Sequence, residues 1–273
     1  MTRFVIVPQW QGSPSARAMQ LVDGAEAIAG DLPRSSCTRV PVPLEAGDAL
    51  GTGVHRYSAL RQVRESLEDT LGSDPERALT VGGDCSVAVA SVGESAARAG
   101  RVVLVWADAH ADLHTPDTSP SGAFGGMALR AILGDGAEGL TLPRETILPT
   151  DVILVGARSL DAEESAYIAA RGIRVLSADD LREPSRLVDA VTGLGADAVH
   201  LHVDVDALDP ADMPGVKAAE PFGVDLTDLI RALKAVRQAV PLAGSSLAGF
   251  APATPASAAS DMGTLLRLVG ALA

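Results

Sequence analysis

The sequence has little cysteine and no long hydrophobic run. Its 273 residues include two cysteines, too few for the disulfide framework of a small secreted protein. No apolar run approaches the roughly 20 residues that a membrane-spanning helix needs. The N-terminal segment MTRFVIVPQW has one Arg, a short apolar run and no small-residue cleavage site, so we interpret it as a first strand rather than a signal peptide. We therefore expect a cytoplasmic protein that does not enter a membrane.

Positive charge is also in deficit. The chain has 22 Lys and Arg against 35 Asp and Glu, for a net charge of −13. Such a balance argues against nucleic acid or an anionic membrane as a partner, and clustered carboxylates could account for part of the excess. With 47% hydrophobic residues and no internal repeat or long linker, we expect one domain over residues 1–273.

Short apolar runs alternate with segments of helical periodicity. The runs are continuously apolar, which is typical of strands buried on both faces of a parallel sheet. They predict strands at residues 4–7, 38–42, 78–81, 102–106, 152–155, 173–176, 199–203 and 246–250. The clearest helical patterns lie at residues 56–72, 225–240 and 259–273. This alternation predicts βαβ units in a three-layer α/β/α sandwich.

Carboxylate side chains follow two of the most apolar predicted strands. Asp108, His110 and Asp112 occur at alternate positions, so they share one face of an extended segment. Asp204 and Asp206 have the same spacing after another strand. Ligand sites in open α/β sheets lie at the carboxyl ends of strands, so we expect these five side chains to converge. Four carboxylates beside one imidazole need a compensating cation, and a divalent metal is the simplest.

The donor types indicate which metal to expect. A set rich in oxygen favours Mn²⁺ or Mg²⁺ over Zn²⁺, and carboxylates from two strands can bridge two ions about 3.5–4 Å apart, as in two-metal hydrolases. An Asp after a strand is often only a cap or turn residue, an interpretation left open for Asp84 and Asp209. Structural roles are equally open for His114, His200 and His202.

Taken together, the motifs resemble those of the ureohydrolases, the family of arginase and agmatinase. Its signatures Gly-Gly-Asp-His-Ser, Asp-Ala-His-x-Asp and Asp-x-Asp-x-x-Asp-Pro correspond to residues 82–86, 108–112 and 204–210, in the same order. The resemblance covers nearly the whole chain and implies an arginase-like fold with an eight-stranded, mostly parallel sheet. It also implies two Mn²⁺ ions per chain and hydrolysis of a guanidine, in which hydroxide between the ions attacks the guanidine carbon and an amine leaves.

The resemblance assigns a ligand set to each ion, carried over by position. The first set is Cys85, Asp108, Asp112 and Asp204, and the second is Asp108, His110, Asp204 and Asp206. Asp108 and Asp204 would therefore bridge the ions. Asp112, close to the hydroxide, is expected to pass its proton to the departing amine. Asp108, Asp112 and Asp204 are thus the predicted catalytic residues.

Three positions depart from the family pattern. Cys85 replaces a His, and a soft thiolate is a poor match for hard Mn²⁺. The alternative is that Cys85 is a small buried side chain and one ion is lost. Gly125 replaces a His that arginases use for proton transfer or substrate orientation. Gly249 replaces a Glu that pairs with the guanidinium in arginases.

The resemblance also suggests three substrate contacts. Ser121 matches a serine that contacts the amino-acid end of the substrate in arginases. His114 stands at the place of an Asn that binds the α-carboxylate, and we expect it to hydrogen-bond a carboxylate too. Glu220, in a loop rich in Gly and Pro, is our candidate to replace the missing Glu.

The missing His and Glu favour a guanidine less basic than that of arginine, which is always charged near neutral pH. N-hydroxylation lowers guanidine basicity and adds an oxygen that can approach a metal. We therefore predict an Nω-hydroxy-L-arginine amidinohydrolase that yields L-ornithine and hydroxyurea. It would be similar to the hydroxyarginases of D-cycloserine, and hence antibiotic, biosynthesis.

Several other functions are weighed against this one. An arginase, agmatinase, guanidinobutyrase or formimidoylglutamase would have the same motifs and act on a different substrate. A deacylase with a single zinc shares the general architecture, but one ion does not need Asp112 together with Asp204 and Asp206. A degenerate binding protein would not be expected to retain every carboxylate, because an unused cluster is electrostatically costly. Since the sequence has no long C-terminal tail of the kind that helps some arginases trimerise, a monomer or a small oligomer is expected.

Overall fold

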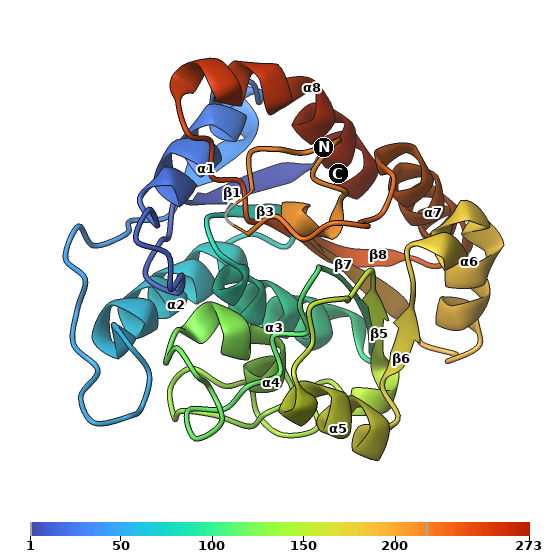
Figure 1. The fold of residues 1–273 in the computed structure, drawn as a ribbon, viewed down its shortest axis with the longest axis horizontal. Coiled ribbons are helices and arrows are strands. Elements are labelled where there is room, and N and C mark those ends of the chain that lie inside the picture. The colour runs from blue at the N-terminus through green and yellow to red at the C-terminus, as the bar shows by residue number, and fades with distance from the viewer. Residues whose placement is uncertain (1, 217) are drawn as a thin grey trace.

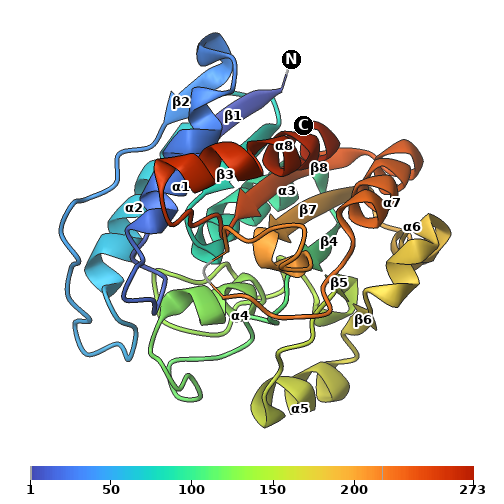
Figure 2. The ribbon, with the colours of Figure 1, turned by 45° about the horizontal axis from the view of Figure 1, so that its top comes forward.

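An eight-stranded sheet forms the centre of the computed structural model, which describes residues 2–216 and 218–273. All of its strand pairings are parallel, in the order β2-β1-β3-β8-β7-β4-β5-β6 (Figure 2). The strands are β1 (Arg3–Val7), β2 (Cys37–Arg39), β3 (Ala78–Gly82), β4 (Val102–Ala107), β5 (Val152–Val155), β6 (Arg174–Leu176), β7 (Ala198–Asp204) and β8 (Leu242–Ala248). The main helices are α1 (Gln20–Gly30), α2 (Tyr57–Gly72), α3 (Ala88–Ala99), α4 (Ala128–Ile132), α5 (Ala162–Arg171), α6 (Pro184–Thr192), α7 (Leu226–Ala239) and α8 (Pro255–Leu272).

All eight predicted strands are present, but several boundaries differ from the prediction. Strand β2, expected at residues 38–42, is Cys37–Arg39. Strand β8 lies four residues earlier than predicted at its start, because small Gly and Ser residues as well as apolar ones pair with β7. It ends before Gly249, whose φ of +87° is not an extended conformation. Helix α8 begins at Pro255 rather than residue 259, because Thr254 and Ser257 form a capping box ahead of the apolar pattern.

Alternate residues of the central strands pack into different cores on the two faces of the sheet. On β4, Val103 and Val105 pack into the core beneath α1, α6, α7 and α8, whereas Leu104 and Trp106 pack into the core beside α2, α3 and α4. Figure 1 shows the two groups of helices on opposite sides of the sheet. The predicted three-layer sandwich is therefore confirmed.

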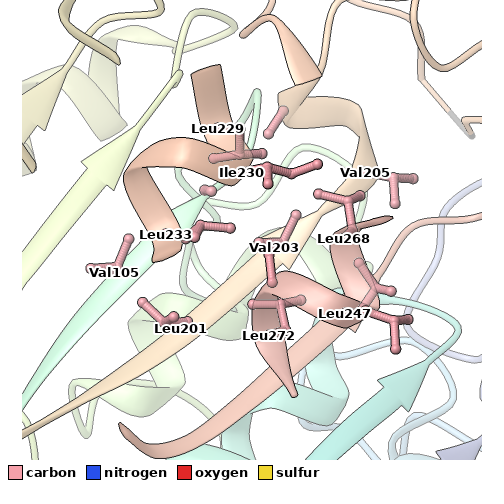
Figure 3. Close-up of a cluster of buried hydrophobic side chains, with 14 of the residues drawn as sticks. Val105, Leu201, Val203, Val205, Leu229, Ile230, Leu233, Leu247, Leu268 and Leu272 are labelled. Carbon is pink, nitrogen blue, oxygen red and sulfur yellow. The ribbon is translucent and has the colours of Figure 1, made fainter. Parts of the chain in front are cut away.

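The first core fixes the central strands rigidly in place. Figure 3 shows Leu201 and Val203 of β7 beneath Leu229 and Leu233 of α7, and all four are fully buried. Burying each such side chain stabilises the fold by about 1.5–3 kcal/mol. The carboxyl ends of β4, β7 and β8 are consequently a firm base for the loops that follow them.

No helix in the described part of the chain is long and apolar enough to cross a membrane.

The other face of β7 carries a buried polar network. The His200 ring nitrogens lie 2.8 Å from Ser95 Oγ and 3.3 Å from Ser246 Oγ, and the side chain is fully buried. Burial, together with the charge of neighbouring His202, lowers the pKa of His200 from 6.5 to about 3. His200 is therefore neutral in the folded protein, and its role is structural.

This buried histidine should make the fold sensitive to acid. As the pH falls below about 6.5, an unfolded chain binds a proton at His200 that the folded chain does not, so the free energy of unfolding decreases towards low pH. The contribution reaches about 1.4 kcal/mol per pH unit. We expect His200→Gln to make the decrease of the urea midpoint between about pH 6 and pH 4 less steep than in the wild type. His55→Gln, at an exposed position, is the control and should keep the wild-type slope; equal slopes in both variants would contradict this account.

Candidate metal centre

Three parallel strands deliver the predicted ligands to one edge of the sheet. Cys85 follows β3 in a 3₁₀ turn (Cys85–Val87), Asp108 follows β4 directly, and Asp204 is the last residue of β7. Strand β8 lies between β3 and β7, and β4 lies on the other side of β7. Because all of these strands are parallel, their carboxyl ends meet at the same edge of the sheet.

The thiol of Cys85 lies against the two carboxylates that were predicted to bridge the ions. Its Sγ is 2.8 Å from Asp204 Oδ2 and 3.6 Å from Asp108 Oδ2, and the residue is only 1% exposed. Asp84 next to it supports the turn: its carboxylate accepts hydrogen bonds from Ser86 N and Gly12 N. Asp84 thus has the cap role that the sequence left open, and Cys85 is the residue of this turn that lies against the cluster.

The imidazole of His110 joins the loops after β4 and β7. Its Nδ1 lies 3.3 Å from both Asp108 Oδ1 and Asp206 Oδ2, while Ala109 N donates a hydrogen bond to Asp206 Oδ1. Burial would lower the pKa of His110, but hydrogen bonds to the two carboxylates and their charges outweigh it and raise the pKa to about 11. The two buried carboxylates therefore stabilise a positive charge strongly at this position.

Two more carboxylates are held in fixed conformations. Asp204 Oδ1 accepts a hydrogen bond from Asp206 N, which begins the 3₁₀ turn at Val205–Ala207. Asp112 is 5% exposed and has a φ of +52°, a left-handed conformation that is uncommon for a residue with a side chain. Such strain persists only where the surroundings enforce it, and it is concentrated at functional sites.

The donor atoms form two adjoining groups that fit two metal ions. One group contains Cys85, Asp108 and His202, the other contains Asp108, His110 and Asp206, and within each the ligand atoms lie within 4.8 Å of one another. Asp108 belongs to both groups, as a bridging carboxylate would. The donors are mainly carboxylate oxygen and imidazole nitrogen, which suit a divalent cation.

His202, whose role the sequence left open, belongs to the first of these donor groups. Its ring stacks on Trp106 with 3.8 Å between centroids, and its Nδ1 lies 2.8 Å from Ser246 Oγ. The available signal was its spacing from Asp204, since residues two apart on a strand point to the same face.

A second polar group lies at the adjacent end of β5. Nε2 of His114 is 3.2 Å from Asp161 Oδ2, and Asp161 caps α5 in a capping box with Glu164. Glu164 in turn accepts a hydrogen bond from Leu113 N, which ties the start of α5 to the loop that carries His114. Sequence reasoning missed Asp161; the signal was an Asp after a strand that pairs with β4.

The other predicted substrate contacts have different partners in the structure. Ser121 is exposed on the loop after β4, and its Oγ accepts a hydrogen bond from Ala123 N. Glu220 lies beside Arg158, which donates a 2.7 Å hydrogen bond to the Glu220 carbonyl. Asp209 accepts hydrogen bonds from Ala211 N and Gly223 N, so it supports this same loop. The substrate roles of Ser121 and Glu220 stay predictions.

Comparison with known proteins now identifies the family. The model of the arginase family matches residues 15–266. The chain belongs to the arginase family. It is 31% identical to the arginase of Staphylococcus aureus (strain COL) over 215 residues, which are 75% of this chain and 71% of that protein.

Solved structures of the family share the fold. Arginase from Entamoeba histolytica in complex with L-ornithine has a TM-score of 0.86 at 22% identity and covers 100% of this chain and 99% of its own. Arginase from Bacillus subtilis has a TM-score of 0.83 at 25% identity and covers 100% and 98%. The predicted arginase-like fold is therefore confirmed.

Membership also establishes the class of reaction. Hydrolases of the arginase family act on guanidino or amidino substrates and depend on a binuclear metal centre. The predicted class of amidinohydrolase is confirmed, and the two adjoining donor groups lie where such a centre is expected.

Replacement of the thiol by imidazole tests its part in the centre. We expect Cys85→His still to bind two Mn²⁺ ions, one of them at least about threefold more tightly, because imidazole nitrogen suits Mn²⁺ better than a soft thiolate. Isothermal titration of the metal-free protein measures both affinities. Cys37→Ser, which changes the other cysteine, is the control and should match the wild type. If Cys85→His no longer bound Mn²⁺, the assignment of residue 85 as a ligand would be wrong.

Proposed function

We propose that the chain hydrolyses Nω-hydroxy-L-arginine to L-ornithine and hydroxyurea with a pair of Mn²⁺ ions. The observation that carries the proposal is the position of Gly249, where arginases have the Glu that pairs with the guanidinium. A Cβ atom at Gly249 would lie 2.0 Å from Asp204 Oδ1, and the φ of +87° is unfavourable for any residue with a side chain. In this chain the Asp204 carboxylate occupies the space that a side chain at position 249 would enter.

A second position supports the same conclusion. Gly125 stands where arginases have the proton-transfer His, and its N–H donates a 2.8 Å hydrogen bond to Gly12 O. A Cβ at Gly125 would lie 3.0 Å from that oxygen, so the loop after β1 closes on the site of the missing side chain. At both glycines, neighbouring atoms stand where a side chain would begin.

The chemistry of the substrate explains how the reaction can proceed without these two groups. Arginine carries a full positive charge at neutral pH and needs a carboxylate to hold it. A hydroxyguanidine is less basic because its oxygen withdraws electrons, so it can bind in the neutral form without a counter-ion. The leaving group is the amine of L-ornithine, as in arginase, and in this proposal Asp112 supplies its proton.

The remaining residues have defined roles in this proposal. Cys85, Asp108, Asp112 and Asp204 would hold one ion, and Asp108, His110, Asp204 and Asp206 would hold the other. When bound, such a pair of ions lowers the pKa of water and supplies hydroxide near neutral pH. The Asp112 carboxylate, fixed by its left-handed backbone, accepts the proton of the attacking water and delivers it to the departing amine.

His114 and Asp161 suit the amino-acid end of the substrate. The Asp161 carboxylate is partly exposed and attracts an ammonium group, while the His114 imidazole beside it hydrogen-bonds an α-carboxylate. A zwitterionic amino acid thus matches the pair. Because the chain resembles hydroxyarginases, we also propose that it acts in D-cycloserine biosynthesis.

Relative turnover of two substrates tests the proposal. We expect kcat/KM on Nω-hydroxy-L-arginine to exceed that on L-arginine by at least about tenfold, because position 249 has no carboxylate to hold a charged guanidinium. Tenfold corresponds to about 1.4 kcal/mol of selective stabilisation of the transition state. The second candidate function is arginase itself, which the names of the relatives favour. A preference for L-arginine of tenfold or more would establish arginase and reject the hydroxyarginine proposal. Metal analysis of the same sample should give two Mn per chain; one zinc would indicate a deacylase.

The role of Asp161 can be separated from catalysis. We expect Asp161→Asn to raise KM for the amino-acid substrate about tenfold or more and to change kcat less than about threefold, because a charge-assisted hydrogen bond worth about 1.5–3 kcal/mol is lost on binding. Steady-state kinetics give both constants. Glu163→Gln, an exposed acid on the same helix, is the control. An unchanged KM in Asp161→Asn would remove this residue from the substrate site.

A further inference from the structure

Arg158 links the two loops that carry the ligands of one ion. It follows β5, the neighbour of β4, and its backbone N–H donates a 2.9 Å hydrogen bond to the carbonyl of Ala109, between Asp108 and His110. Its side chain reaches the other loop: Nη2 donates to the carbonyl of Asp206 at 2.8 Å. One residue therefore bonds to the main chain beside three candidate ligands.

All three nitrogens of the guanidinium donate hydrogen bonds to backbone carbonyls. Beyond Asp206, its N–H groups donate to the carbonyls of Gly156, Ala207, Leu208, Glu220 and Pro221, at 2.7–3.3 Å. Only a planar guanidinium, with five N–H groups in a fixed fork, can serve so many acceptors at once. A lysine ammonium has three N–H groups on a single nitrogen and would leave several carbonyls without a donor.

The charge of Arg158 also suits its surroundings. Burial lowers its pKa, and the carboxylates of Asp206, Glu220, Asp108 and Asp209 oppose that effect. A guanidinium remains protonated at any pH at which the protein functions. Arg158 is thus a permanent cation beside the carboxylates, and it acts on them through the backbone rather than as a ligand.

We propose that Arg158 is a positioning residue for the ion held by Asp108, His110, Asp204 and Asp206. It holds the carbonyl of Asp206 on one side and the Asp108–His110 turn on the other, so it sets the separation of donors from two loops. The ion that Cys85 and Asp112 help to bind depends less on this link. The inference rests on the proposed two-ion centre but not on the identity of the guanidine.

Metal binding without substrate tests the inference. We expect Arg158→Met to weaken one of the two Mn²⁺ ions by about 10–100-fold, as is typical when a partner behind the ligands is lost, and to leave the other within about threefold. Calorimetric titration of the metal-free protein gives the two affinities. Anomalous scattering from crystals at limiting Mn²⁺ shows which position loses occupancy, and we expect the position beside His110 and Asp206.

Arg101→Met is the matched control. Arg101 pairs with Asp151 at 2.7 Å and links the starts of the same two strands, β4 and β5, at the opposite edge of the sheet. We expect it to lower the melting temperature and leave both metal affinities unchanged. If Arg158→Met behaved like Arg101→Met, or weakened both ions equally, Arg158 would be a structural residue only and the inference would be overturned.

Arg158→Lys covers the case in which the Met variant does not fold. It keeps the charge but loses most of the hydrogen bonds, so we expect the same ion to be weakened at least about threefold at a near-normal melting temperature. Unchanged affinities in a folded Arg158→Lys would also reject the inference. Because no substrate is used, a failure to hydrolyse Nω-hydroxy-L-arginine would reject the proposed substrate without affecting this result.

Discussion

Repulsion among buried carboxylates is the constraint on which the rest of this structure depends. Asp108, Asp112, Asp204 and Asp206 are all at most 5% exposed. Gathering them away from water requires hydrogen-bond donors and positive charge. Backbone N–H groups of the two loops supply the donors, and the permanent charge of Arg158 supplies part of the charge. His110 is protonated in the metal-free protein, with its pKa of about 11, and gives up that proton when it binds an ion. The negative charge that remains unbalanced is the reason that a centre of this kind binds metal cations.

The parallel sheet makes such a concentration of charge possible. Apolar cores on both faces of the sheet fix the strands. The loops at their carboxyl ends therefore start from fixed positions, in spite of the repulsion between the carboxylates. The thiol of Cys85 is packed among the carboxylates rather than exposed, which favours a role as a committed ligand over one as a nucleophile. The differences from arginases lie around the same cluster, because the Asp204 carboxylate occupies the space beside Gly249 and the carbonyl of Gly12 lies against Gly125.

Most of the fold was predictable because its signals are local. Continuous apolar runs identified all eight strands, and helical periodicity identified α2 and α7 within one or two residues. The boundaries of β2, β8 and α8 were predicted wrongly. At β8, small residues that carry no apolar signal also pair with β7, and at α8 a capping box precedes the apolar pattern. At the site, the motifs identified the carboxylates, but the prediction of one shared extended face was wrong. Strand β4 ends at Ala107, Asp112 has a left-handed backbone, and Asp206 lies in a 3₁₀ turn.

The sequence by itself determined the class of fold, the five cluster residues of the two strand-end motifs and the likeness to one enzyme family, because each depends on residues close together in the chain. Only the tertiary structure decided that β8 lies between β3 and β7, that Asp161 meets His114, and that Gly249 lies against Asp204. It also decided that Arg158 spans two loops. These contacts join residues about 45 or more positions apart, and strand order, which no local pattern encodes, brings them together.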